Sequence, residues 1–98
     1  MVKSFKQFLN EGKHEFVVYH NSYQSAVSSA LDYIEKTGYT VVEDDVWKEI
    51  SMGPKKPNDG VTNKMSIGLL KSGKLVKKMA HIQIYGMGKK YELNIYIN

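Results

Sequence analysis

The sequence predicts a small α+β domain, in which one long amphipathic helix packs on one face of an antiparallel β-meander of three to four strands, with a short helix at the N-terminus. Three observations carry this prediction. Apolar residues recur at helical spacing between residues 23 and 34, and they alternate with polar or small residues after residue 65. The length of 98 residues supports one modest hydrophobic core and not two.

The start of the chain has the pattern of a short amphipathic helix. Ser4 and Gln7 have the spacing of a capping box, and Gly12 suits the position after the last turn. Two turns are too short to form a stable helix alone in water, so this segment is expected to dock on another surface or to be recognised by another protein. Its apolar face comprises Val2, Phe5, Phe8 and Leu9.

The long helix has the clearest pattern in the chain. Asn21 or Ser22 is expected to cap its N-terminus, and Gly38 is expected to end it. Its apolar positions are spaced at three and four residues, which places them on one stripe. That stripe comprises Tyr23, Ala26, Val27, Ala30, Leu31 and Ile34.

Three other segments have weaker patterns. Residues 15–20 are β-branched and aromatic, which predicts a strand, and residues 39–43 are expected to be extended. Residues 44–50 fit one or two helical turns capped by Asp44 and Asp45, but a strand remains the alternative.

The last third of the chain predicts a meander with two hairpin turns. Residues 72–73 form a two-residue turn, which pairs Met65 with Ala80. Residues 86–89 form the second turn, which pairs Ala80 with Ile95. The two registers agree, because both place the same residues on one face of the sheet.

The two faces of the predicted meander differ in chemistry, and the long helix is expected to cover the apolar one. The inner face comprises Met65, Ile67, Leu69, Val76, Ala80, Ile82, Ile84, Tyr91, Leu93, Ile95 and Ile97. The outer face comprises Lys64, Lys77, Met79, His81, Gln83, Tyr85, Glu92, Asn94 and Tyr96.

Charge is distributed unevenly along the chain. Residues 32–49 carry six acids and two lysines, a net charge of −4, whereas residues 55–90 carry nine lysines and one acid, a net charge of +8. All 14 basic residues are lysine, so bidentate arginine contacts to phosphate or guanine are excluded. The basic half fits a polyanionic partner, and protection of sheet edges by lysine is the alternative explanation.

Several functional classes lack the residues they need. The chain has no cysteine, which excludes disulfides, thiolate metal sites and cysteine nucleophiles. His14 and His20 are six residues apart, which suits neither a strand nor a helix as a metal site. Lys74 completes a partial phosphate-loop pattern, but Leu75 stands where Ser or Thr is needed. We therefore expect no enzyme, metal or cofactor, and the longest apolar run, residues 16–19, predicts no membrane span.

The outer face is the best candidate for binding. Aromatic rings stack bases while lysines contact phosphates, as in sequence-tolerant single-strand binders. The alternative is that another part of the chain or a second subunit covers this face, and an oligomer through the sheet face or its edge is consistent with the pattern. The candidate nucleic-acid-binding residues are Lys55, Lys56, Lys64, Lys77, Lys78, His81, Tyr85 and Tyr96.

Residues 1–12, MVKSFKQFLNEG, resemble the capsid-targeting leader of internal head proteins in T-even-type tailed phages. In that family, the prohead protease cuts after a Leu/Ile-x-Glu tripeptide and before a small residue, positions that Leu9, Glu11 and Gly12 match here. The resemblance implies a removable leader, 1–11, and one domain, 12–98. It also implies phage head components or the prohead protease as partners, and the virion interior or host cytoplasm as location.

A second resemblance covers residues 39–98. The words GPKKP, TNKMSI, HIQIYGMG and KYELNIYIN are similar to small proteins of marine tailed phages that have no assigned activity. The first functional hypothesis is therefore a non-enzymatic phage accessory protein, packaged in the head and trimmed after Glu11. The alternatives are a single-stranded nucleic-acid-binding module, and an inhibitor or adaptor that acts on a host protein through the acidic middle of the chain.

Overall fold

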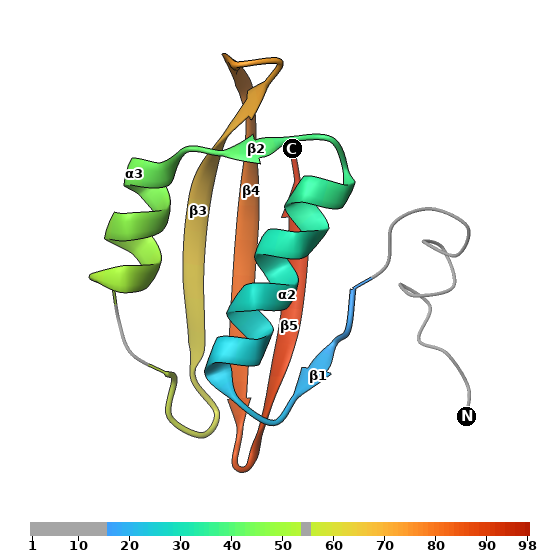
Figure 1. Cartoon of the computed structure of the whole chain (residues 1–98). Helices are drawn as coiled ribbons and strands as arrows, with labels where there is room; N and C mark the ends of the chain where they lie inside the picture. Colours follow the sequence, from blue (N-terminus) through green and yellow to red (C-terminus); the bar gives the residue numbers. More distant parts are fainter. Residues whose placement is uncertain (1–15, 54–55) are drawn as a thin grey trace.

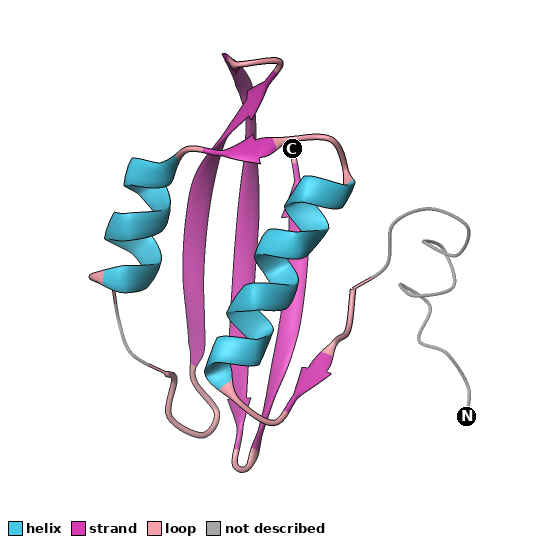
Figure 2. Ribbon diagram, viewed as in Figure 1, coloured by secondary structure: helices cyan, strands magenta, loops and turns pink. Residues whose placement is uncertain are grey.

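A computed structural model gives the fold, and it describes residues 16–53 and 56–98. Figure 1 and Figure 2 show an α+β arrangement in which helices lie on one side of a curled antiparallel sheet. The sheet has five strands in the order β1-β5-β4-β3-β2, of which β3, β4 and β5 form the expected meander. The elements are β1 (Tyr19–His20), α2 (Tyr23–Lys36), β2 (Thr40–Val41), α3 (Glu43–Val46), the π-helical segment η1 (Trp47–Ser51), β3 (Thr62–Lys71), β4 (Lys74–Met87) and β5 (Lys90–Ile97).

The long helix is confirmed as α2. The side chain of Ser22 caps it by accepting a hydrogen bond from the backbone N–H of Ser25 at 3.1 Å. Gly38 follows the last turn with φ +97°, a conformation that side chains with a Cβ rarely adopt. Ala26 and Ala30 are fully buried, so the helix can lie close against the sheet.

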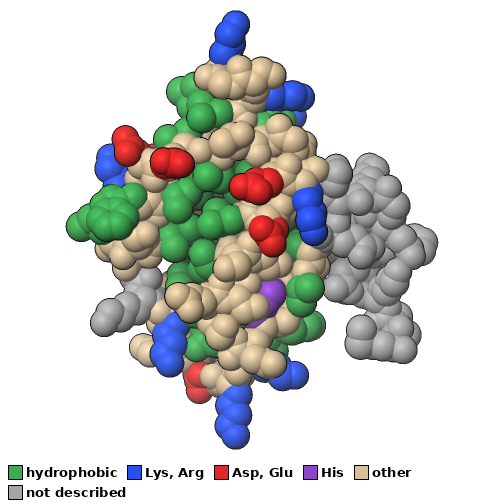
Figure 3. Space-filling model, in the orientation of Figure 1, with side chains coloured by type: hydrophobic (Ala, Val, Ile, Leu, Met, Phe, Trp, Pro, Cys, Tyr) green, Lys and Arg blue, Asp and Glu red, His purple; other side chains and the backbone are tan. Residues whose placement is uncertain are grey.

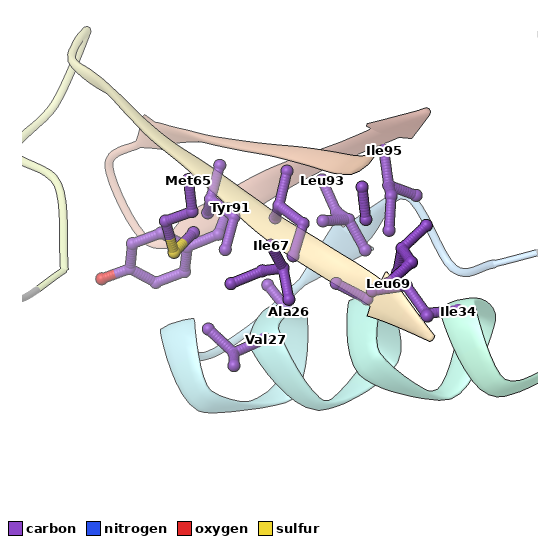
Figure 4. Close-up of a cluster of buried hydrophobic side chains, with 13 residues drawn as sticks. Ala26, Val27, Ile34, Met65, Ile67, Leu69, Tyr91, Leu93 and Ile95 are labelled. Atoms are coloured by element: carbon purple, nitrogen blue, oxygen red, sulfur yellow. The ribbon is translucent and has the colours of Figure 1, made fainter. Parts of the chain in front are cut away.

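The core is a single layer of side chains between α2 and the inner face of the sheet, and Figure 4 shows it from the side. The predicted inner face is confirmed, although Val76 and Ile97 are only half-buried. The buried core residues are Ala26, Val27, Ala30, Ile34, Met65, Ile67, Leu69, Ala80, Ile82, Ile84, Tyr91, Leu93 and Ile95.

The predicted register of the first hairpin is wrong over most of its length. Next to the turn, Leu70 pairs with Leu75, as the predicted register requires. Beyond Gly68 a bulge shifts the pairing by two residues, so Met65 faces Ile82 rather than Ala80. A shift of two residues leaves every side chain on its predicted face, because side chains alternate with a period of two.

The second hairpin is also shifted by two residues. Its turn occupies only the two residues between Met87 and Lys90, where a four-residue turn was expected. Gly88 supplies the positive φ of +75° that this tight turn needs. Ala80 consequently pairs with Ile97 rather than with Ile95.

The weaker sequence patterns are only roughly matched. The strands expected at residues 15–20 and 39–43 shorten to β1 and β2, with two residues each. Residues 44–50 are helical rather than extended, but the expected capping by Asp44 and Asp45 is wrong. Val42 is the N-cap residue, and no side chain caps this helix. The short helix expected before Gly12 lies outside the described residues.

The carboxylates of α3 and η1 bind the edge of β3 instead. Asp45 Oδ2 accepts a hydrogen bond from the backbone N–H of Gly68 at 2.8 Å, and Glu49 Oε1 accepts one from that of Ser66 at 3.2 Å. A Cβ on Gly68 would lie 2.7 Å from Asp45 Oδ2, so glycine permits this approach. The two carboxylates occupy donors that would otherwise be free to pair with another strand.

Replacing Ile82 by alanine should lower the free energy of unfolding by about 2–5 kcal/mol, because a fully buried side chain leaves a cavity. Leu31, which was expected to be equally buried, is half-buried, so Leu31→Ala should cost clearly less. Denaturant unfolding measures both losses. Equal losses, or none, would contradict the packing of α2 on this face.

Replacing Asp45 by alanine should lower the free energy of unfolding by about 1.5–3 kcal/mol, the usual contribution of a hydrogen bond to a charged group. The amide of Gly68 should also exchange with solvent faster. Asp44→Ala is the matched control, because Asp44 is an exposed acid in the same helical turn. Unchanged amide exchange at Gly68 in the Asp45 variant would show that the carboxylate does not hold this edge.

Candidate nucleic-acid interface

The outer face of the sheet lies opposite α2, and large side chains project from it into solvent. Tyr85 is 37% exposed and Tyr96 is 45% exposed. Lys64 on β3 and Lys77 on β4 are also exposed. Each projects from the outer face because it alternates with the buried inner residues of its strand.

One row of side chains crosses the middle of this face. Ser66, His81 and Tyr96 face one another across β3, β4 and β5. The His81 and Tyr96 rings stack, with centroids 4.9 Å apart and an angle of 28° between their planes. The stack links β4 to β5 on this face, and each ring keeps the π-face that points away from the other.

Hydrogen bonds on both sides hold the His81 ring in place. Its Nε2 lies 2.8 Å from Asn98 Oδ1 and its Nδ1 lies 3.1 Å from Ser66 Oγ. The Asn98 oxygen can only accept, so Nε2 carries the hydrogen and Nδ1 accepts from the Ser66 hydroxyl. This tautomer follows from the network of partners.

The neighbours predicted for His81 are wrong because the register is shifted by two residues. Asn94 and Lys64 were expected beside it, but both align with Gln83, one pair further along the sheet. Lys64 is therefore a diagonal neighbour of His81 and not a direct one. Sequence reasoning missed Ser66 and Asn98, which a correct register would have identified as partners of the ring.

Tyr85 forms a second aromatic position on the same face. It lies four residues from His81 along β4, roughly 13 Å at the usual rise per residue. Its cross-strand partners are Thr62 and Glu92. The Glu92 carboxylate makes this end of the face less attractive to an anion than the end that carries Lys77, and Lys64 lies between the two ends, in the row of Gln83.

The predicted basic residues do not form one cluster. Lys77 and Lys78 are exposed on β4 toward the first hairpin turn, and Lys56 is exposed in the loop before β3. Lys55 lies outside the described residues. The compact part of the site is therefore Lys64 with the stacked rings of His81 and Tyr96. The predicted cleavage residues Leu9, Glu11 and Gly12 also lie outside the described residues.

Ser66, His81 and Asn98 resemble a nucleophile, its base and an orienting group, but the arrangement lacks a key catalytic part. The backbone N–H next to a serine nucleophile usually stabilises the oxyanion. Here the N–H of Ser66 itself donates to Glu49. The hydrogen bonds of Ser66 and Asn98 are therefore better suited to fixing the position of the His81 ring than to acyl transfer.

A second concave surface lies between α2 and the start of the described chain, and His20 lines it. Both of its ring nitrogens are engaged, Nδ1 with Ser25 Oγ at 2.6 Å and Nε2 with the Val17 carbonyl at 2.8 Å. This histidine therefore joins β1 to α2 and does not offer a free nitrogen to a ligand.

Residues 16–53 and 56–98 contain no group of histidines or acids placed to hold a metal ion. No helix in that part of the chain is both long and apolar enough to cross a membrane. Comparison of the chain with protein-family models, curated proteins and solved structures finds no match.

Proposed function

We propose that this protein is a non-enzymatic binding protein whose outer sheet face binds single-stranded nucleic acid with little sequence preference. The observation that carries this proposal is the His81–Tyr96 stack, a pair of aromatic rings at the centre of a sheet face. A base can stack on an outer face of this pair whatever its identity, because every base has a π-face. Lys64 lies diagonally beside His81 and is placed to contact a phosphate.

The charges on the outer face favour one direction for a bound nucleic-acid strand. Lys77 and Lys78 extend the basic surface toward the first hairpin turn, whereas Glu92 lies beside Tyr85 at the other end. A phosphate backbone that follows the favourable charge therefore runs from Lys64 toward Lys77. Without arginine, duplex DNA should be bound with little base preference, because the commonest guanine contact is bidentate.

Binding to a labelled single strand should weaken as salt increases, with a slope of about −3 in log affinity against log salt if four phosphates are contacted. Tyr96→Ala should cost about 1–3 kcal/mol of binding free energy through lost stacking. Lys64→Gln should reduce the magnitude of the salt slope by about 0.7, the value of one contact. Fluorescence anisotropy at low and physiological salt measures both effects.

Lys48→Gln is the matched control for Lys64, since it removes the same charge from η1, away from the outer face. It should leave both affinity and slope unchanged. Absence of binding at low salt, where exposed charges are least screened, would contradict the proposal. If Lys64→Gln and Lys48→Gln had equal effects, binding would depend on the net charge of the protein and not on the outer face.

A second candidate function is that of a phage accessory protein packaged in the virion head, and it rests on the resemblance of residues 1–12 to a capsid-targeting leader. Cleavage after Glu11 would leave the described residues, and with them the core residues from Ala26 to Ile95, in the mature chain.

A chain that begins at Gly12 should therefore keep its secondary structure and most of its thermal stability, as measured by circular dichroism. Mass spectrometry of purified virions should find the protein with Gly12 as its first residue. Aggregation of the shortened chain, or virions that contain only the uncleaved protein or none, would contradict the leader hypothesis.

A further inference from the structure

The hairpin between β3 and β4 forms a basic arm that projects beyond the rest of the sheet (Figure 1). We define the arm as residues 71–78. Ser72 and Gly73 both have positive φ, +53° and +78°, which gives the tight turn that keeps the two strands paired to the tip. The arm carries four exposed lysines, Lys71, Lys74, Lys77 and Lys78.

An exposed leucine lies among these lysines. Leu75 is 73% exposed, the largest exposed fraction of any large hydrophobic side chain in the described chain. Its partner across the hairpin is Leu70, so it belongs to the paired part of the arm and not to a loop. Leu75 therefore gives the basic arm an exposed apolar side chain as well as positive charge.

The helical side of the molecule carries a surface of opposite character. An open groove of about 450 Å³ lies beside α3, and Trp47 on its wall is 58% exposed. Figure 3 shows hydrophobic side chains gathered between α3 and α2, with acidic side chains on both sides of them. The groove is lined by Val41, Glu43, Asp44, Val46, Trp47 and Ser51.

The arm and the groove match in both charge and apolar content. The groove lining carries two acids, Glu43 and Asp44, and the arm carries four lysines. The exposure of Leu75 shows that the arm does not occupy the groove of its own chain. Pairing of a free β3 edge, the other route to self-association, is obstructed because Asp45 and Glu49 occupy two of its N–H groups.

We propose that the arm of one copy docks in the α3 groove of a second copy of this chain. Leu75 would lie against Val46 and Trp47, and the arm lysines would pair with Glu43 and Asp44. The contact joins two different surfaces, so it is head-to-tail, and each added copy brings a further free arm or groove unless the assembly closes. A small, partly charged contact predicts weak association that salt reduces.

Sedimentation velocity tests the proposal with two paired variants. The arm variant combines Lys74→Glu with Leu75→Ser, and the groove variant combines Asp44→Lys with Trp47→Ser. The wild-type chain should associate at low salt and dissociate at high salt, and each variant alone should be monomeric. A mixture of the two should form a one-to-one complex, because the groove of the arm variant and the arm of the groove variant are both intact.

Lys90→Glu is the matched control, since it reverses one charge at the opposite hairpin and should not affect association. Circular dichroism checks that each variant is folded. If Trp47→Ser unfolds the chain, the single change Asp44→Lys serves as the groove variant. None of the substituted residues belongs to the proposed nucleic-acid face, so failure of one proposal is distinguishable from failure of the other.

Three results would overturn the proposal. A wild-type chain that remains monomeric at low salt up to about 1 mM, the weak end of measurable affinities, would leave the groove to a basic segment of another protein. Association that neither variant reduces would place the contact elsewhere. A mixture that stays monomeric would exclude docking of the arm in the groove.

Discussion

Burial of one face of the β3–β4–β5 meander under α2 is the interaction on which the rest of the described structure depends. A helix of 14 residues is about 21 Å long, which is enough to cover the centre of one face of a five-stranded sheet. Ala26 and Ala30 bring the helix close, and the larger Ile34 is fully buried near the end of the helix, beside Leu69 (Figure 4). The described residues form one hydrophobic layer, and no described helix covers the opposite face of the sheet.

The short elements β1, β2, α3 and η1 protect the two edges of the sheet, which α2 does not cover. β1 pairs with β5 at one edge, and His20 joins that strand to the helix through its hydrogen bond with Ser25. At the other edge β2 pairs with only two residues of β3, and the carboxylates of α3 and η1 bind the next N–H groups. The acidic segment therefore has a structural role.

The charges are distributed unevenly between the helices and the sheet. The acidic residues of α2 and α3 lie on the helical side (Figure 3), together with Lys36 and Lys48, whereas the described lysines of β3 and β4 belong to the sheet and its arm. Aromatic side chains occur in both regions, Trp47 beside the acids and the His81–Tyr96 stack beside Lys64. The two proposed functions thus use different regions of one small domain, except that Lys77 and Lys78 belong both to the arm and to the path proposed for the nucleic acid.

The sequence by itself determined the helix, the meander and the face on which each meander residue lies. These features depend on local spacing, three or four residues in a helix and two in a strand. Only the tertiary structure decided the register, because a shift of two residues leaves every face unchanged. The partners of His81 and the binding of Asp45 to Gly68 follow from that register and from packing between distant segments, so no local pattern could reveal them.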